Sequence, residues 1–93
     1  MSEPGVIRRV VKVVNERGLH ARAAAAFVKL AGTFEAELTV AQGETAVSGG
    51  SIMGLMMLAA APGTELSISG KGADAERAVA ALTALVEAGF GET

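Results

Sequence analysis

The sequence contains no cysteine, no tryptophan and no tyrosine. Without cysteine there are no disulfide bridges, no thiolate nucleophile and no cysteine-ligated metal centre. Three phenylalanines are the only aromatic residues, so the core has to consist of aliphatic side chains and methionine. Nucleic-acid binding needs a basic surface and usually stacking aromatic side chains, whereas the formal net charge here is −2. We therefore expect no nucleic acid among the partners.

Long apolar segments are also scarce. Residues 45–64 carry no charge, but their apolar part runs only from Ile52 to Ala61, well short of the roughly 20 residues of a membrane-spanning helix. The first residues include Glu3 and no apolar run follows them, which does not resemble a signal peptide. The sequence predicts a cytoplasmic protein without membrane insertion, and a length of 93 residues predicts one domain over residues 1–93.

The chain does contain alternating strand and helix patterns. A Val- and Ile-rich segment favours a strand, and period-two alternation predicts further strands; the four strands are expected at residues 6–14, 34–40, 45–48 and 64–69. Apolar residues three and four apart, together with helix-forming residues, predict helices at residues 21–31, 52–58 and 75–86. The order β-α-β-β-α-β-α predicts an α+β fold, in which helices pack on one face of an antiparallel sheet.

Several residues are expected to end or begin these elements. Gly32 is expected to follow the first long helix as a C′ residue, Ser51 to be the N-cap of the short helix, and Asp74 to cap the last one. Gln42-Gly43 and residues 70–72 are expected to be turns. In residues 34–40 the apolar positions, which are expected to face the core, are Phe34, Ala36, Leu38 and Val40.

The stretch Gly-Leu-His-Ala-Arg at residues 18–22 is the most informative one. His20 is the only histidine, and it stands where the turn after the first strand meets the start of a helix. The free backbone N–H groups of Ala21, Arg22 and Ala23 would form an anion site at that helix end. The Arg22 guanidinium is suited to phosphate oxygens, and a neutral imidazole is a nucleophile near neutral pH. The pattern indicates a phosphoryl acceptor, His20, within an anion site.

Simpler interpretations remain open at this point. A lone histidine at a helix start is often a surface residue or a weak cap, and a lone arginine is often a solvated helix charge. No second carboxylate or base lies near His20 in the sequence, and there is neither a metal-ligand cluster nor a glycine-rich nucleotide loop. We therefore expect no metal, no cofactor and no stand-alone enzyme.

Two motifs together resemble a known family. Gly-Leu-His-Ala-Arg before an alanine-rich helix, and residues 51–58, are similar to the two motifs of the phosphocarrier protein HPr family at the expected separation, and the likeness extends from Val6 to Gly91. The resemblance implies an open-faced β-sandwich, with a four-stranded antiparallel sheet and three helices on one face. It also implies that an enzyme I-type protein, drawing on phosphoenolpyruvate, phosphorylates the δ nitrogen of His20. The group would then pass to an EIIA-type protein, and Arg22 would steady it.

Ser51 matches the regulatory serine of that family, which an HPr kinase modifies in some lineages. A phosphate there would add a charge of about −1.5 to −2, so it would disturb docking on the neighbouring apolar surface more than the fold. A plain N-cap explains Ser51 equally well. Because the chain has Gly49-Gly50 where a longer polar residue is common, recognition by a kinase would be altered.

The short helix cannot bury every side chain. Leu55 and Leu58 are expected in the core, while Ile52, Met53 and Met56 are expected to be exposed beside the His20 loop. By resemblance this surface would dock donor and acceptor, and flexible methionines suit several partners. The alternative is that the methionines fill gaps in the core.

One departure from the family pattern stands next to the active-site motif. Ala23 occupies the position where proline is common, and we expect the helix to form and transfer to continue with a looser first turn. We expect a monomer. Two other functions stay open: a regulatory relay of the nitrogen-related phosphotransferase branch, and an interaction module in which His20 is not phosphorylated.

Overall fold

Four antiparallel strands form one sheet in the order β1-β4-β2-β3 in the computed structural model, which describes residues 5–92. The strands are β1 (Val6–Lys12), β2 (Glu37–Gln42), β3 (Thr45–Ser48) and β4 (Glu65–Lys71). Residues 1–4, which the signal-peptide interpretation concerns, and residue 93 lie outside the described part. Each central strand pairs with two neighbours, so β4 connects the first strand of the chain to the hairpin formed by β2 and β3.

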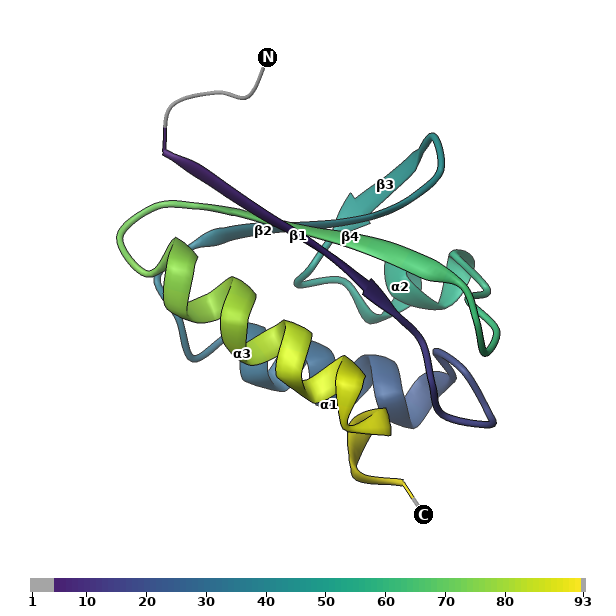
Figure 1. Ribbon diagram of the computed structural model, residues 1–93. Coiled ribbons are helices and arrows are strands. Elements are labelled where there is room, and N and C mark those ends of the chain that lie inside the picture. Colours follow the sequence, from purple (N-terminus) through teal and green to yellow (C-terminus); the bar gives the residue numbers. More distant parts are fainter. Residues whose placement is uncertain (1–4, 93) are drawn as a thin grey trace.

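Three α-helices lie on the same side of this sheet (Figure 1). They are α1 (Ala21–Ala31), α2 (Ile52–Met57) and α3 (Ala75–Glu87), and a 3₁₀ turn η1 (Gly89–Gly91) follows α3. The helix α3 packs against β1 and β4, while α1 contacts both α2 and α3. The predicted α+β architecture and element order are confirmed.

The core lies between the helices and the sheet and is almost entirely aliphatic. Phe27 on α1 is its one fully buried aromatic residue among those described. The sheet contributes Val11, Leu38, Val40, Leu66 and Ile68, and α3 contributes Ala78, Val79, Leu82 and Val86. Alternate residues of β2 and β4 are buried, as expected for strands with one face against helices.

The second strand begins at Glu37, three residues later than predicted. Phe34 and Ala36 precede the strand in a bend and are only partly buried. The reason is a pair of hydrogen bonds to the start of α3: the Glu35 amide donates to Asp74 Oδ2 (2.8 Å), and the Asp74 amide donates to the Glu35 carbonyl (3.0 Å). Asp74 is the N-cap residue of α3, as predicted, but its side chain makes no cap hydrogen bond to the helix.

Four other predictions about how elements end are also wrong. Gly32 is the C-cap of α1 with a right-handed φ of −67°, so the helix ends without a left-handed glycine. The helix α2 ends at Met57, one residue early, and the first strand ends at Lys12 rather than residue 14. Residues 70 and 71, expected in a turn, extend β4 because Lys71 pairs with β1 on one side and β2 on the other.

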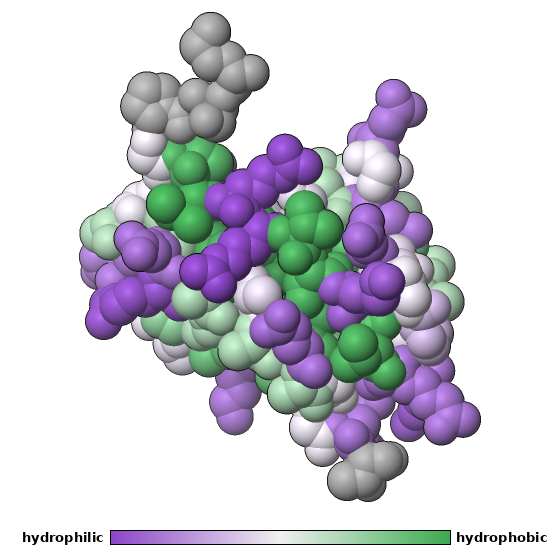
Figure 2. Space-filling model, viewed as in Figure 1, coloured by the Kyte–Doolittle hydropathy of each residue, from purple (hydrophilic) through white to green (hydrophobic). Residues whose placement is uncertain are grey.

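The side of the sheet that the helices leave uncovered is not uniformly polar. The strand β1 lies at the edge of the sheet and crosses the front of Figure 1, and Figure 2, viewed from the same direction, shows apolar side chains among polar ones on this front of the molecule. Val10 in β1 and Val14 just after it are exposed, and Arg8, Arg9 and Lys12 carry positive charge along the same strand. Basic side chains thus interrupt the exposed apolar surface.

Candidate functional site

Residues 13–19 form a tightly held loop that carries His20 to the start of α1. The Val13 amide donates to the Thr64 carbonyl (2.9 Å), and the Leu19 amide donates to the Ala60 carbonyl (2.9 Å). Gly18 between them has a φ of +67°, and a Cβ at this position would lie 2.3 Å from the Ala60 oxygen. Only glycine fits both this conformation and this space, so the loop has one well-defined course.

His20 is the N-cap residue of α1. Its backbone is extended, with φ −78° and ψ 178°, and its carbonyl accepts the first hydrogen bond of the helix, from Ala24. The Arg22 amide donates to the ring nitrogen Nδ1 of His20 at 3.2 Å. Nδ1 therefore faces the free N–H groups of the first helical turn, to which Ala21 and Ala23 also belong.

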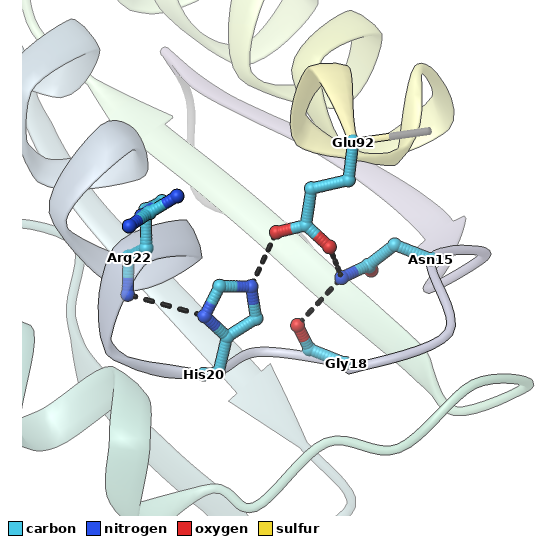
Figure 3. A network of polar contacts seen from close by, with 5 residues as sticks. All are labelled: Asn15, Gly18, His20, Arg22 and Glu92. Atoms are coloured by element: carbon cyan, nitrogen blue, oxygen red, sulfur yellow. Dashed lines mark hydrogen bonds and ion pairs between the residues drawn. The ribbon is translucent and has the colours of Figure 1, made fainter.

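The other ring nitrogen contacts a carboxylate from the end of the chain. Figure 3 shows Glu92, which follows η1, reaching back to His20, where its Oε2 contacts Nε2. The second oxygen, Oε1, accepts a hydrogen bond of 3.0 Å from Asn15 Nδ2. The same Asn15 nitrogen donates to the Gly18 carbonyl at 2.7 Å. The end of the chain thus meets the loop and helix start around His20, more than seventy positions earlier in the sequence.

The neighbours of Asn15 determine how its amide is oriented. Both partners, the Gly18 carbonyl and the Glu92 carboxylate, are acceptors, so the NH₂ group has to face them. Asn15 is buried, with 6% of its surface exposed. Its hydrogen bond, followed by the contact with His20, holds the pKa of the Glu92 carboxyl below its usual value. Glu92 is thus ionised throughout the neutral pH range.

Beside this cluster lies an open pocket of about 620 Å³. It is lined from one side by Asn15, Arg17 and Arg22, and from the other by Phe90 and Glu92. Glu16 also lines it, so the positive charge of the two arginines is offset in part by the carboxylates of Glu16 and Glu92. The groups that favour an anion are the free N–H groups at the start of α1. Within residues 5–92 no three His, Asp or Glu side chains lie close enough together to hold a metal ion.

The sequence did not reveal two members of this cluster, Asn15 and Glu92. No second carboxylate was expected near His20, but the fold brings Glu92 into contact with it. Glu92 is 72 positions away from His20 in the sequence, and Asn15 lies in the turn after the first strand, where no functional residue was predicted from the sequence. One feature of the sequence could have pointed to this region: the two glycines on either side of Phe90 are typical of a chain reversal after α3. Nothing in the spacing indicated where that reversal points.

The second predicted motif forms α2, which packs against α1. Ser51 is its N-cap, and the Ser51 hydroxyl accepts from the Gly54 amide at 2.9 Å. Leu55 and Leu58 are buried, whereas Ile52, Met53 and Met56 are exposed. Met57 is the most exposed of the four, although the sequence reasoning did not include it in the docking surface. The methionines of this helix thus do not fill the core.

Comparison with known proteins decides the family. A family described as the PTS HPr component phosphorylation site matches residues 7–88, nearly the whole chain. The chain belongs to the HPr family. Its resemblance to HPr proteins, expected from two short motifs, is therefore confirmed over the full fold.

The relatives of this HPr-family chain include proteins named HPr and a protein named NPr. It is 44% identical to the phosphocarrier protein HPr of Neisseria meningitidis over 87 residues, covering 94% of this chain and 98% of that one. It is 45% identical to the phosphocarrier protein NPr of Shewanella violacea over 86 residues, covering 92% and 94%. Both are named phosphocarriers, so the family supports a role as carrier within the phosphotransferase system.

Solved structures agree with this assignment. The crystal structure of an HPr from Thermoanaerobacter tengcongensis superimposes with a TM-score of 0.89 at 38% identity, covering 94% of this chain and 98% of that one. The HPr of Bacillus anthracis gives 0.84 at 40% identity, with 87% and 96% covered. In the described part of this HPr-family chain, no helix combines the length and apolarity that crossing a membrane requires.

Proposed function

We propose that this chain is a histidine phosphocarrier in which Nδ1 of His20 accepts a phosphoryl group from an enzyme I-type protein and passes it to an EIIA-type protein. The observation that carries this proposal is the position of Nδ1, which faces the amide of Arg22 at the start of α1. A phosphoryl group on Nδ1 would replace the lone pair that now accepts this N–H. Its oxygens would then meet the free amides of Ala21, Arg22 and Ala23.

The charges around the ring support the same proposal. The Arg22 guanidinium lines the pocket next to the helix start, where it can stabilise phosphate oxygens. The His20 side chain is 16% exposed, so a docking protein can reach it while most of the ring stays fixed. Phosphoryl transfer depends mainly on positioning and charge stabilisation. A small carrier can therefore serve without a catalytic machinery of its own.

Donor and acceptor would bind the surface formed by the exposed side chains of α2, together with the His20 loop. Ile52, Met53 and Met56 belong to this proposed docking surface, and Met57 extends it. Flexible methionine side chains can repack against partners of different shape. We also propose that Ser51 is a regulatory phosphorylation site for an HPr kinase-type enzyme. The carrier is proposed to act as a monomer.

A regulatory relay is the second candidate, because one of the similar proteins is an NPr. The 45% identity with the NPr of Shewanella violacea is as high as the 44% with the HPr of Neisseria meningitidis. Both branches would use the same histidine chemistry, so the residues of the site do not separate them. The two branches can be distinguished by measuring which acceptor removes the phosphoryl group fastest, a sugar-specific EIIA or a regulatory one.

Incubation with enzyme I and phosphoenolpyruvate tests the central proposal. We expect the wild-type chain to take up one phosphoryl group, labile in acid and stable in base, as phosphohistidine is. His20→Ala should lose this modification completely while keeping the same far-UV circular dichroism. Phosphate on the alanine variant would contradict the assignment of His20, and an unmodified wild-type chain would favour the interaction module.

A further inference from the structure

The contact between Glu92 and His20 lies on the ring nitrogen opposite the one proposed to react. The Arg22 amide is a donor, so Nδ1 must carry a lone pair in order to accept its hydrogen bond. The neutral ring therefore has its proton on Nε2. Glu92 Oε2 lies against that nitrogen and accepts this proton in a hydrogen bond. The two partners together select one tautomer, the one in which Nδ1 is the nucleophile.

The carboxylate is itself held in place. Asn15 Nδ2 donates to Glu92 Oε1 and to the Gly18 carbonyl, so the buried amide links Glu92 to the loop that carries His20. A carboxylate that is itself held by a hydrogen bond can fix the orientation of an imidazole to which it is hydrogen-bonded. Carboxylates act in this way on metal-bound histidines. Arg17 lies near enough to attract the same carboxylate.

The backbone before Glu92 is bent in an unusual way. Gly89, Phe90 and Gly91 have φ values of +64°, +58° and +76°, three left-handed residues in succession. Phe90 has a side chain, so its left-handed conformation is unfavourable. This reversal turns the chain from the end of α3 back toward the His20 loop, and Gly89 packs beside Asn15. Unfavourable backbone conformations of this kind tend to occur where they position a functional group.

We propose that Glu92 is a positioning residue, which holds His20 as its Nε2–H tautomer and balances the positive charge that the ring gains when Nδ1 becomes phosphorylated. The inference rests on the proposed function. In the step, the Nδ1 lone pair forms a bond to phosphorus, and the P–N bond of the donor phosphohistidine breaks. Its electron pair stays on the donor ring, which becomes neutral. His20 keeps its Nε2 proton, so its ring becomes cationic next to the Glu92 carboxylate.

Two variants of Glu92 and one control test this role. Glu92→Gln keeps an oxygen acceptor but removes the charge, and Glu92→Ala removes both. Glu87→Gln, at the exposed end of α3, removes one negative charge away from the ring. We expect the maximal rate of phosphoryl uptake from phosphorylated enzyme I to fall about threefold in Glu92→Gln and about tenfold in Glu92→Ala, since a hydrogen bond to a charged group is lost at a partly exposed site. The carrier concentration at half-maximal rate should not change.

A spectroscopic readout separates positioning from a purely structural role. Because His20 is the only histidine, labelling histidine with ¹⁵N gives one assignable ring. We expect a downfield, slowly exchanging Nε2–H proton in the wild type and in Glu87→Gln, and its loss in Glu92→Ala. Urea unfolding of each variant shows whether the fold is retained.

The outcomes distinguish this inference from the proposed function. If the wild type is phosphorylated and Glu92→Ala reacts at the same rate or faster with an unchanged ring proton, Glu92 does not position His20, although the carrier function stands. If the wild type takes up no phosphate, the carrier function fails. The ring-proton measurement then still decides whether Glu92 selects the tautomer.

Discussion

The two ring nitrogens of His20 have different hydrogen-bond partners. Nδ1 faces an amide donor at the start of α1, and Nε2 faces a carboxylate anchored by Asn15. Either nitrogen of an imidazole can act as a nucleophile, so in the proposed function the neighbours decide which of them accepts the phosphoryl group. Sequence patterns placed His20 at the start of its helix correctly. They did not reveal the partner of Nε2, because hydrogen bonds between distant segments leave no periodicity in the chain.

Ser51 offers a residue-scale prediction with a matched control. Asp and Asn are both good N-caps, so Ser51→Asp and Ser51→Asn should unfold at about the same urea concentration as the wild type. We expect only Ser51→Asp to slow phosphorylation of His20, by about tenfold, because it places a negative charge beside the exposed α2 side chains. Rates measured with enzyme I and phosphoenolpyruvate compare the two variants. Equal rates would show that charge at this position does not control docking.

At the scale of elements, the loop from β1 to α1 depends on one glycine. We expect Gly18→Ala to lower the free energy of unfolding by about 3 kcal/mol, because the new Cβ would clash with the Ala60 carbonyl and the backbone is left-handed. Gly43→Ala is the matched control, since Gly43 has a similar φ of +59° and open space around it. Its expected cost is about 1 kcal/mol.

Urea denaturation followed by circular dichroism measures both glycine variants. If the two lost the same stability, the steric contact with Ala60 would be unimportant and only the left-handed backbone would matter. Phosphoryl uptake by Gly18→Ala should also fall, because the carbonyl of Gly18 binds Asn15 and thereby the ring partner Glu92.

The elements themselves were largely predictable, and the errors occur where distant segments pair. Local alternation and helical spacing located all four strands and all three helices. The start of β2 was misplaced because Glu35 bonds to Asp74 instead of to a neighbouring strand, and β4 continues through Lys71 because two strands flank it. Asp74 takes the predicted N-cap position, but its side chain does not cap the helix, since its carboxylate already accepts from the Glu35 amide and pairs with Arg77. Such choices depend on tertiary partners, which a local pattern does not contain.

At the scale of the whole molecule, two carboxylates make the fold sensitive to acid. The hydrogen bond from the Glu35 amide, then the contact with Arg77, holds the pKa of the Asp74 carboxyl below its ordinary value of 3.8. The pKa of Glu92 lies below its ordinary value of 4.5, for which the bond from Asn15 is the first cause. The unfolded chain therefore binds more protons in acid than the folded one. Stability from these groups is present above these ordinary values and is lost as the pH falls below them.

We expect the melting temperature to fall between about pH 5 and about pH 3, and to fall less in a variant with both Asp74→Asn and Glu92→Gln. Circular dichroism melts at closely spaced pH values measure this. Glu87→Gln again serves as the control, with an unchanged profile. A double variant as acid-sensitive as the wild type would assign the loss to other carboxylates.

The way the His20 loop is anchored has a consequence for folding. Its amide bonds go to Ala60 and Thr64, and its ring partner comes from residue 92, while β1 pairs only with β4 across more than fifty positions. Contacts between such distant positions form late, because long loops must close first. A nascent or partly folded chain would therefore have the histidine but not its surroundings. Competence for phosphorylation would thus report that the last long-range pairings have formed.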